Sequence, residues 1–156
     1  MEFDFLVAID NEIIDYKNHL SSQHIGGVMA VHTDDAFPDL SEVKIALVGV
    51  LENRGDEGVA TVVDLTSVRK SLYGLFMGNW KMGIADLGDI LAGNSTMDTY
   101  FAVKKVVASL IKKGIVPIVI GGSQDLTYAL YRAYDELEQM VNLVAIDNKF
   151  DFGKET

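Results

Sequence analysis

The sequence predicts an α/β fold in which a mostly parallel sheet carries helices on its faces. The apolar runs Lys44–Val50 and Ile115–Ile120 are predicted to be strands, and the near-continuous hydrophobic character of the first indicates burial on both faces. A segment with helical spacing of apolar residues follows each run, and a glycine-containing loop separates each run from its helix. Strands that alternate with helices in this way indicate a parallel sheet, and right-handed crossovers are expected to connect them.

The 156 residues are expected to form a single domain, in which residues 1–43 are a less regular lead-in. Phe5–Ile9 is either a short first strand or an apolar lead-in, and a helix is expected to begin at Asp10 or Asn11. Val28–Val31 is predicted to be a short strand. The acidic, proline-containing residues 32–42 are predicted to form a loop.

The first helix predicted between the two confident strands begins at Thr66, a candidate N-cap, and ends at Gly78–Asn79. Its expected core-facing stripe consists of Val68, Leu72, Leu75 and Phe76. A weak short strand, Met82–Ala85, should follow. Asp86 and Asp89 would then lie at the end of that strand, either as turn and capping residues or as site residues.

A second helix is predicted from Ser95, because Ser95 and Asp98 have the spacing of a capping box. Lysines in its last turn suit the helix dipole, and Gly114 is a natural C-terminal stop. The residues expected to face the core are Met97, Phe101, Val103, Val107, Leu110 and Ile111.

The most informative stretch is the last third of the chain. The glycine turn, defined here as residues 121–125, follows the run that ends at Ile120 and precedes a helix with an apolar stripe of Leu126, Ala129, Leu130, Ala133 and Leu137. A second apolar run, Leu143–Ile146, is predicted to be a buried strand that ends in the acidic turn Asp147–Asp151. Ligands collect at the carboxyl ends of parallel strands, so these two turns are expected to form the floor of any site. Because so few residues follow a strand expected to be central, we expect the chain to be the N-terminal part of a longer domain.

Each turn admits two interpretations from its residues alone. Gly121 and Gly122 either let a ligand approach the backbone at a helix N-terminus or only make a tight turn. The sequence has neither G-x-G-x-x-G nor a P-loop here, so a Rossmann-like nucleotide binder is disfavoured. Asp147 and Asp151 either share a hard cation such as Mg²⁺ or Mn²⁺ or form a solvated acidic turn.

Composition excludes several classes of function. The chain has no cysteine, which rules out disulfides and cysteine nucleophiles, and its formal net charge of −10 disfavours binding to nucleic acid. No apolar run approaches the roughly 20 residues of a membrane span, and the N-terminus lacks the basic region of a signal peptide, so a cytoplasmic protein without a membrane partner is expected. All three histidines lie in the first 32 residues, so no Ser-His-Asp arrangement can be argued and no catalytic residue is identified.

The motifs between Lys44 and Gly153 resemble, in the same order, those of the arginase/agmatinase/formimidoylglutamase family, the ureohydrolases. Val68–Arg69 is similar to the family's isoleucine-arginine helix signature, and Ile84–Ile90 is similar to its D-x-G-D segment. Gly121–Asp125 lies where the family has G-G-x-H, and Asp147–Asp151 lies where it has D-A-H-x-D.

The resemblance implies a three-layer, arginase/deacetylase-like α/β fold that is incomplete at its C-terminus. It also implies a pair of Mn²⁺ ions that activate a water for hydrolysis of a small guanidino or formimino compound, and it leaves a homo-oligomer open. Asp147 and Asp151 correspond to retained metal carboxylates, whereas Gln124 and Lys149 replace the family's two metal histidines. The expected site-lining residues are Gly121, Gly122, Ser123, Asp125 and Asn148.

These departures lead to three hypotheses about function. A glutamine is a poor Mn²⁺ ligand, the ammonium of Lys149 would repel a cation, and the family's S-x-D-x-D motif lies downstream, so the leading hypothesis is a ureohydrolase-family pseudoenzyme. The second is an enzyme with a rebuilt site in which Asp125, Asp147, Asp151 and acids further downstream bind a metal through oxygens alone. The third is a non-catalytic binding or assembly module in which Lys149 forms a structural ion pair with the two aspartates.

Overall fold

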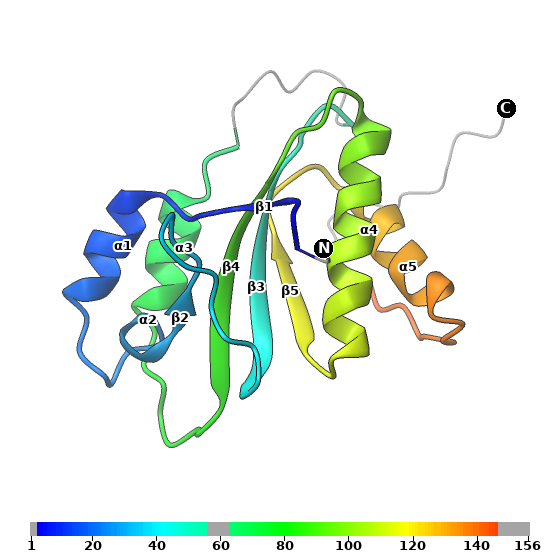
Figure 1. Cartoon of the computed structure of the whole chain (residues 1–156). Coiled ribbons are helices and arrows are strands. Elements are labelled where there is room, and N and C mark those ends of the chain that lie inside the picture. The colour runs from blue at the N-terminus through cyan, green and yellow to red at the C-terminus, as the bar shows by residue number, and fades with distance from the viewer. Residues whose placement is uncertain (1–2, 56–62, 147–156) are drawn as a thin grey trace, which may run out of the picture.

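The computed structural model describes residues 3–55 and 63–146 of the chain (Figure 1). Helices and strands alternate along most of its length, as the sequence predicts. In chain order they are β1 (Leu6–Val7), α1 (Asn11–Asn18), α2 (Ile25–Val28), β2 (Ala30–Val31), β3 (Val43–Leu51), α3 (Thr66–Tyr73), β4 (Gly83–Leu91), α4 (Thr96–Lys112), β5 (Val116–Ile120) and α5 (Leu126–Glu136).

A five-stranded, mostly parallel sheet forms the centre of the fold. Its strand order is β1-β4-β3-β5, and β2 also pairs with β4. Strand β3 runs parallel to both β4 and β5, β2 runs parallel to β4, and only the two-residue β1 is antiparallel. Because β3, β4 and β5 run in the same direction, their carboxyl ends meet at one edge of the sheet.

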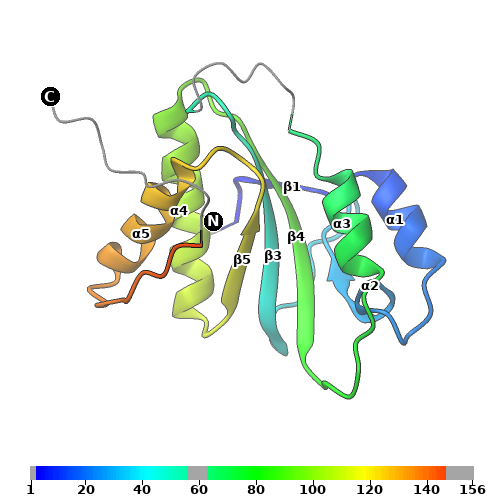
Figure 2. The same ribbon diagram turned by 180° about the vertical axis from the view of Figure 1, so that it is seen from behind.

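Helices cover both faces of the sheet and make the three layers that the resemblance implies. Helices α4 and α5 pack together on one face, while α1, α2 and α3 gather on the other (Figures 1 and 2). Two apolar clusters fill the spaces between the layers, and the larger one lies between the sheet and α4–α5. The predicted α/β class is therefore confirmed.

Helix α4 carries the largest share of the core on its face of the sheet. Val103, Val107 and Leu110 are at most 1% exposed, and burying a side chain of this size contributes about 1.5–3 kcal/mol. The predicted inward orientation of Met97 and Phe101 is wrong, because these side chains are 63% and 49% exposed. Both side chains border a surface hollow between α4 and α5, and the Phe101 ring also packs edge-on against Phe5.

The predicted ends of α4 are confirmed. Ser95 Oγ accepts a hydrogen bond from the Asp98 backbone N–H at 3.3 Å, and Asp98 Oδ2 accepts one from the Ser95 backbone N–H at 2.8 Å. The two residues thereby satisfy two backbone donors at the helix start, which is the purpose of a capping box. Gly114, just after the helix, has φ of +71°.

Helix α3 differs from its prediction in both its ends and its buried face. Its N-cap is Leu65, which makes no side-chain capping bond, and the helix ends at Gly74. The predicted stripe residues Val68, Leu75 and Phe76 are 43%, 53% and 71% exposed. The residues that α3 buries are Arg69 and Tyr73, which both donate hydrogen bonds to the Asp86 carboxylate of the sheet beneath them.

Strand β4 is longer than the predicted Met82–Ala85 and passes through the middle of the sheet. Asp86 and Asp89, predicted at a strand end, lie within the strand, and Asp86 is fully buried. A buried carboxylate needs compensating donors, which Arg69 and Tyr73 supply. The interpretation of these aspartates as turn or capping residues is therefore wrong.

The predicted strand Leu143–Ile146 is absent. Residues 141–146 have no regular secondary structure, and Leu143, Val144 and Ile146 are 69%, 82% and 99% exposed. A four-residue apolar run becomes a strand only when a neighbouring strand accepts its backbone hydrogen bonds, and this run pairs with none of the described strands. No helix among the described residues is long and apolar enough to cross a membrane.

Candidate functional site

A cluster of polar side chains lies where the carboxyl ends of β3, β4 and β5 meet. Each strand end contributes through the loop or helix that follows it: Glu52 follows β3, α4 follows β4, and the glycine turn follows β5. We call this group the carboxyl-edge cluster. Its members are Glu52, Arg54, Thr99, Tyr100, Ser123 and Asp125.

Glu52 is fully buried yet charged. Both of its carboxylate oxygens accept hydrogen bonds from Arg54, from Nε to Oε1 at 2.9 Å and from Nη2 to Oε2 at 2.6 Å. The Thr99 hydroxyl donates to Oε2 at 2.8 Å. The hydrogen bonds from Arg54 outweigh the effect of burial and lower the pKa of Glu52 to about 2.

Arg54 connects this carboxylate to the neighbouring strand end. Its Nη1 and Nη2 donate to the carbonyl oxygens of Asn94 and Gly93, at 3.1 and 2.8 Å, in the loop between β4 and α4. Arg54 therefore joins two loops, and four of its five N–H donors are directed at protein atoms.

The glycine turn is closely packed against the rest of the protein. Gly121 and Gly122 have φ of +81° and +79°, and a Cβ at Gly122 would lie 2.0 Å from Leu126 Cδ1. The Ser123 backbone N–H donates to the Glu52 carbonyl oxygen at 2.9 Å. Protein atoms occupy the space that a ligand would need beside these glycines, so the geometry favours the tight-turn interpretation.

Asp125, the acid of the glycine turn, has one carboxylate oxygen that accepts a hydrogen bond and one that does not. The Tyr100 hydroxyl donates to Oδ2, and Gly55 packs so closely that a Cβ there would lie 2.3 Å from Oδ1. Oδ1 is buried without a hydrogen-bond partner. The bond to Asp125, together with burial, raises the pKa of Tyr100 to about 12, so the phenol remains a donor at neutral pH.

The structure brings together only part of the predicted site. Gly121, Gly122, Ser123, Gln124 and Asp125 lie at the carboxyl edge as expected, and Gln124 is exposed to solvent. The predicted residues of the acidic turn, Asp147, Asn148, Lys149 and Asp151, lie outside the described residues. Among residues 3–55 and 63–146, no group of three or more His, Cys, Asp and Glu side chains is arranged to hold a metal ion.

Sequence reasoning missed Glu52, Arg54, Thr99 and Tyr100. One signal for Glu52 was available. It directly follows a strand predicted to be buried on both faces, and this position places it at the carboxyl edge of the sheet. Thr99 and Tyr100 carried no such signal, because they lie near the start of α4, 47 and 48 positions after Glu52 in the sequence. Only the fold brings them to the cluster.

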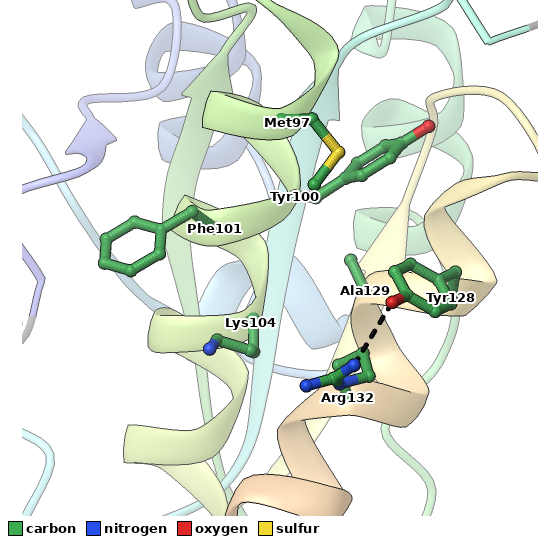
Figure 3. A pocket seen from close by; sticks show the side chains of 7 residues that line it. All are labelled: Met97, Tyr100, Phe101, Lys104, Tyr128, Ala129 and Arg132. Atoms are coloured by element: carbon green, nitrogen blue, oxygen red, sulfur yellow. Dashed lines mark hydrogen bonds between the residues drawn. The ribbon is translucent and has the colours of Figure 1, made fainter.

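Of two hollows on the surface, one borders this cluster through Tyr100 and the other lies beside α3. Figure 3 shows the smaller one, of about 190 Å³, between α4 and α5, where Arg132 donates to the Tyr128 hydroxyl at 3.2 Å. The volume is below the roughly 300–1,000 Å³ of typical ligand pockets, and its other cation, Lys104, is paired with Glu136 at 2.9 Å. The second hollow is an apolar groove of about 550 Å³ beside α3, where Phe76 and Trp80 are largely exposed.

Comparison with known proteins identifies the family of this chain. No significant match was found among curated protein sequences. Among solved structures, the chain is similar to the agmatine ureohydrolase of Thermoplasma volcanium, with a TM-score of 0.51 and 21% sequence identity over 77% of this chain. The chain spans 41% of the length of that protein, and at this level of identity the similarity concerns the fold. The arginase family model matches residues 61–156, more than half of the chain, and the chain therefore belongs to the arginase family.

Proposed function

We propose that this chain has the arginase-family fold without the family's dimanganese chemistry, and that it acts as a pseudoenzyme whose function is binding or assembly rather than hydrolysis. The observation that supports this most directly is the state of the acidic groups beside Gln124. Glu52 is neutralised by Arg54 and Thr99, and one oxygen of Asp125 accepts a hydrogen bond from Tyr100. Within the part of the chain that the structure describes, neither carboxylate is arranged with other His, Cys, Asp or Glu side chains to hold a metal ion.

The residues at the carboxyl edge do not fit the pair of Mn²⁺ ions that the family resemblance implies. Gln124 offers a neutral amide oxygen in place of an imidazole nitrogen, and its side chain is exposed to solvent. Lys149, which replaces the second histidine of the family pattern, brings an ammonium that repels a cation or takes its place between carboxylates. Loss of both imidazoles removes too much of the coordination shell for a hydrolytic step to be assigned here.

A calorimetric Mn²⁺ titration of the full reading frame tests this proposal, with Asp147→Asn as the control. The expected result is no saturable heat at millimolar metal in either protein, and no release of urea or formamide from guanidino or formimino compounds. Saturable heat in the native protein that Asp147→Asn abolishes would overturn the proposal. The Gln124→His, Lys149→His double variant gives the converse test, since restoring the two imidazoles should increase metal binding above the native level.

A rebuilt metal site with oxygen ligands is the second candidate, and one observation favours it. Asp125 Oδ1 is buried without a hydrogen-bond partner. A bound cation would satisfy this oxygen. A ligand that binds only the native state raises the melting temperature. This candidate therefore predicts that Mg²⁺ or Mn²⁺ raises the melting temperature of the native protein but not that of Asp125→Asn.

A further inference from the structure

Arg69 lies in a buried polar network between α3 and β4. Its side chain is 3% exposed, Nε donates to Asp86 Oδ2 at 2.8 Å, and Nη2 lies 2.8 Å from Asp89 Oδ1. The Tyr73 hydroxyl donates to the same Asp86 oxygen at 2.9 Å. Burial would lower the pKa of Arg69, but the two carboxylates raise it, so the guanidinium stays charged and holds α3 at a fixed place on the sheet.

Leu65 connects this network to the carboxyl edge. It is the N-cap residue of α3, and its carbonyl oxygen accepts the Arg69 backbone N–H at 2.9 Å. The Leu65 side chain is buried above two glycines. A Cβ at Gly49 would lie 2.7 Å from Leu65 Cδ1, and a Cβ at Gly121 would lie 2.6 Å from Cδ2.

The Leu65 side chain and the Arg69–Asp89 ion pair both pack against Gly49 of β3. The same hypothetical Cβ at Gly49 would lie 1.9 Å from Asp89 Oδ1 and 3.0 Å from Arg69 Nη2. Gly49 is paired with Ile120, the residue directly before Gly121. Arg69, Leu65 and Gly121 are therefore in sequence along one continuous packed path, and dense packing transmits displacements along such a path.

We propose that Arg69 positions the glycine turn of the carboxyl edge and does so through Leu65. The ion pairs with Asp86 and Asp89 fix α3, and α3 holds the Leu65 side chain against Gly121. On the other side of the turn, the Ser123 backbone N–H is bonded to the Glu52 carbonyl oxygen. The orientation of Gln124 and Asp125 thus depends on an arginine of α3 that is buried against β4. This role is independent of whether the site binds a metal.

Amide hydrogen exchange measured by NMR on the full chain tests the proposal. The reporter is the Ser123 amide, and the reference is the Val107 amide in α4, which lies on the opposite face of the sheet and reports global unfolding. Arg69→Met and Leu65→Ala are each expected to speed exchange at Ser123 about tenfold relative to Val107. Lys70→Met, which removes the neighbouring cation paired with Glu12 at the surface, should leave the ratio unchanged.

The double variant separates positioning from a general structural role. If Arg69 acts through Leu65, Arg69→Met should add little to the change already caused by Leu65→Ala, because the two share one path. Multiplied effects in the double variant, or equal acceleration at Ser123 and Val107 in the single variants, would overturn the proposal. If Arg69→Met does not fold, Arg69→Lys, which keeps the charge but loses the forked donors, is measured against Leu65→Val with the same criteria.

Discussion

Glu52 and Arg54 form an ion pair in which one partner is buried and the other reaches solvent. Arg54 Nη2 lies 2.6 Å from Glu52 Oε2, and the two side chains are 43% and 0% exposed. The pair lies directly after the end of β3. Arg54 also donates hydrogen bonds to the carbonyl oxygens of Gly93 and Asn94 and so connects this end to the loop after β4. The carboxyl edge of this sheet is therefore held by charge as well as by backbone hydrogen bonds.

Substituting Glu52→Gln should lower the free energy of unfolding at neutral pH by about 1–3 kcal/mol, because Arg54 and the buried Thr99 hydroxyl lose their charged acceptor. Urea denaturation followed by circular dichroism measures this loss. Glu42→Gln is the matched control, since Glu42 is exposed and should change stability by less than about 0.5 kcal/mol. Equal effects of the two substitutions would show that the ion pair does not stabilise the fold.

The same pair predicts a pH dependence with a defined window. The pKa of Glu52 is about 2 in the folded protein, below its ordinary value of 4.5, so its contribution to stability is complete above pH 4.5 and is lost as pH falls towards 2. The native protein should lose stability more steeply across this range than Glu52→Gln does. Parallel stability curves for the two proteins would contradict the prediction.

Replacing Tyr100 with phenylalanine should destabilise the protein by about 1–2 kcal/mol, since the Asp125 carboxylate then loses its recorded donor. Thermal or urea unfolding provides the measurement. Tyr128→Phe is the control, because the Tyr128 ring is half exposed and its hydroxyl only accepts a bond from the exposed Arg132. Ultraviolet titration of tyrosine ionisation adds a second readout. The native protein should show a transition near the Tyr100 pKa of about 12, and this transition should be missing from the titration curve of Tyr100→Phe.

Gly122→Ala should be much more damaging than Gly114→Ala, although both glycines have positive φ. A left-handed conformation alone destabilises an alanine by about 1–2 kcal/mol, and overpacking adds about 1–3 kcal/mol. Only Gly122 incurs both, since a Cβ at Gly114 meets nothing within 4 Å. Chemical denaturation of the two variants gives the difference directly, and equal losses would mean that the glycine turn is more open than the structure describes.

Asp86→Asn should lower the free energy of unfolding by about 3 kcal/mol or more, because it leaves the buried Arg69 without its main partner. The exposed pair between Arg132 and Asp135 provides the comparison. Asp135→Asn should change the free energy of unfolding by no more than about 1 kcal/mol. Calorimetric melting of the two variants checks the prediction, and a small loss for Asp86→Asn would indicate that Asp89 alone compensates Arg69.

Local sequence signals predicted much of the fold. The apolar runs that became β3 and β5, the capping box at Ser95 and the stop at Gly114 were all identified from residues that are neighbours in the chain. The stripe on α5 is also confirmed, because Leu126, Ala129 and Ala133 are buried. These features depend on hydrophobic periodicity and on capping chemistry, which a short segment carries by itself.

The candidate site was less predictable. The sequence located the glycine turn, but it did not indicate that Leu126 and Leu65 would fill the space around Gly121 and Gly122. Nor could it pair Glu52 with Thr99. The contacts that decide what the turn can bind come from segments far apart in the chain, and no local pattern encodes them.

The alternation of strands and helices, and the motifs that resemble those of the arginase family, follow from the sequence alone. Only the tertiary structure decided that Asp86 is a buried partner of Arg69 and that Leu143–Ile146 is not a strand among the described residues. The physical reason is the range of the interactions. Periodicity and capping act within a few residues, whereas the burial of a charge and the pairing of a strand depend on which partner the whole fold brings within reach.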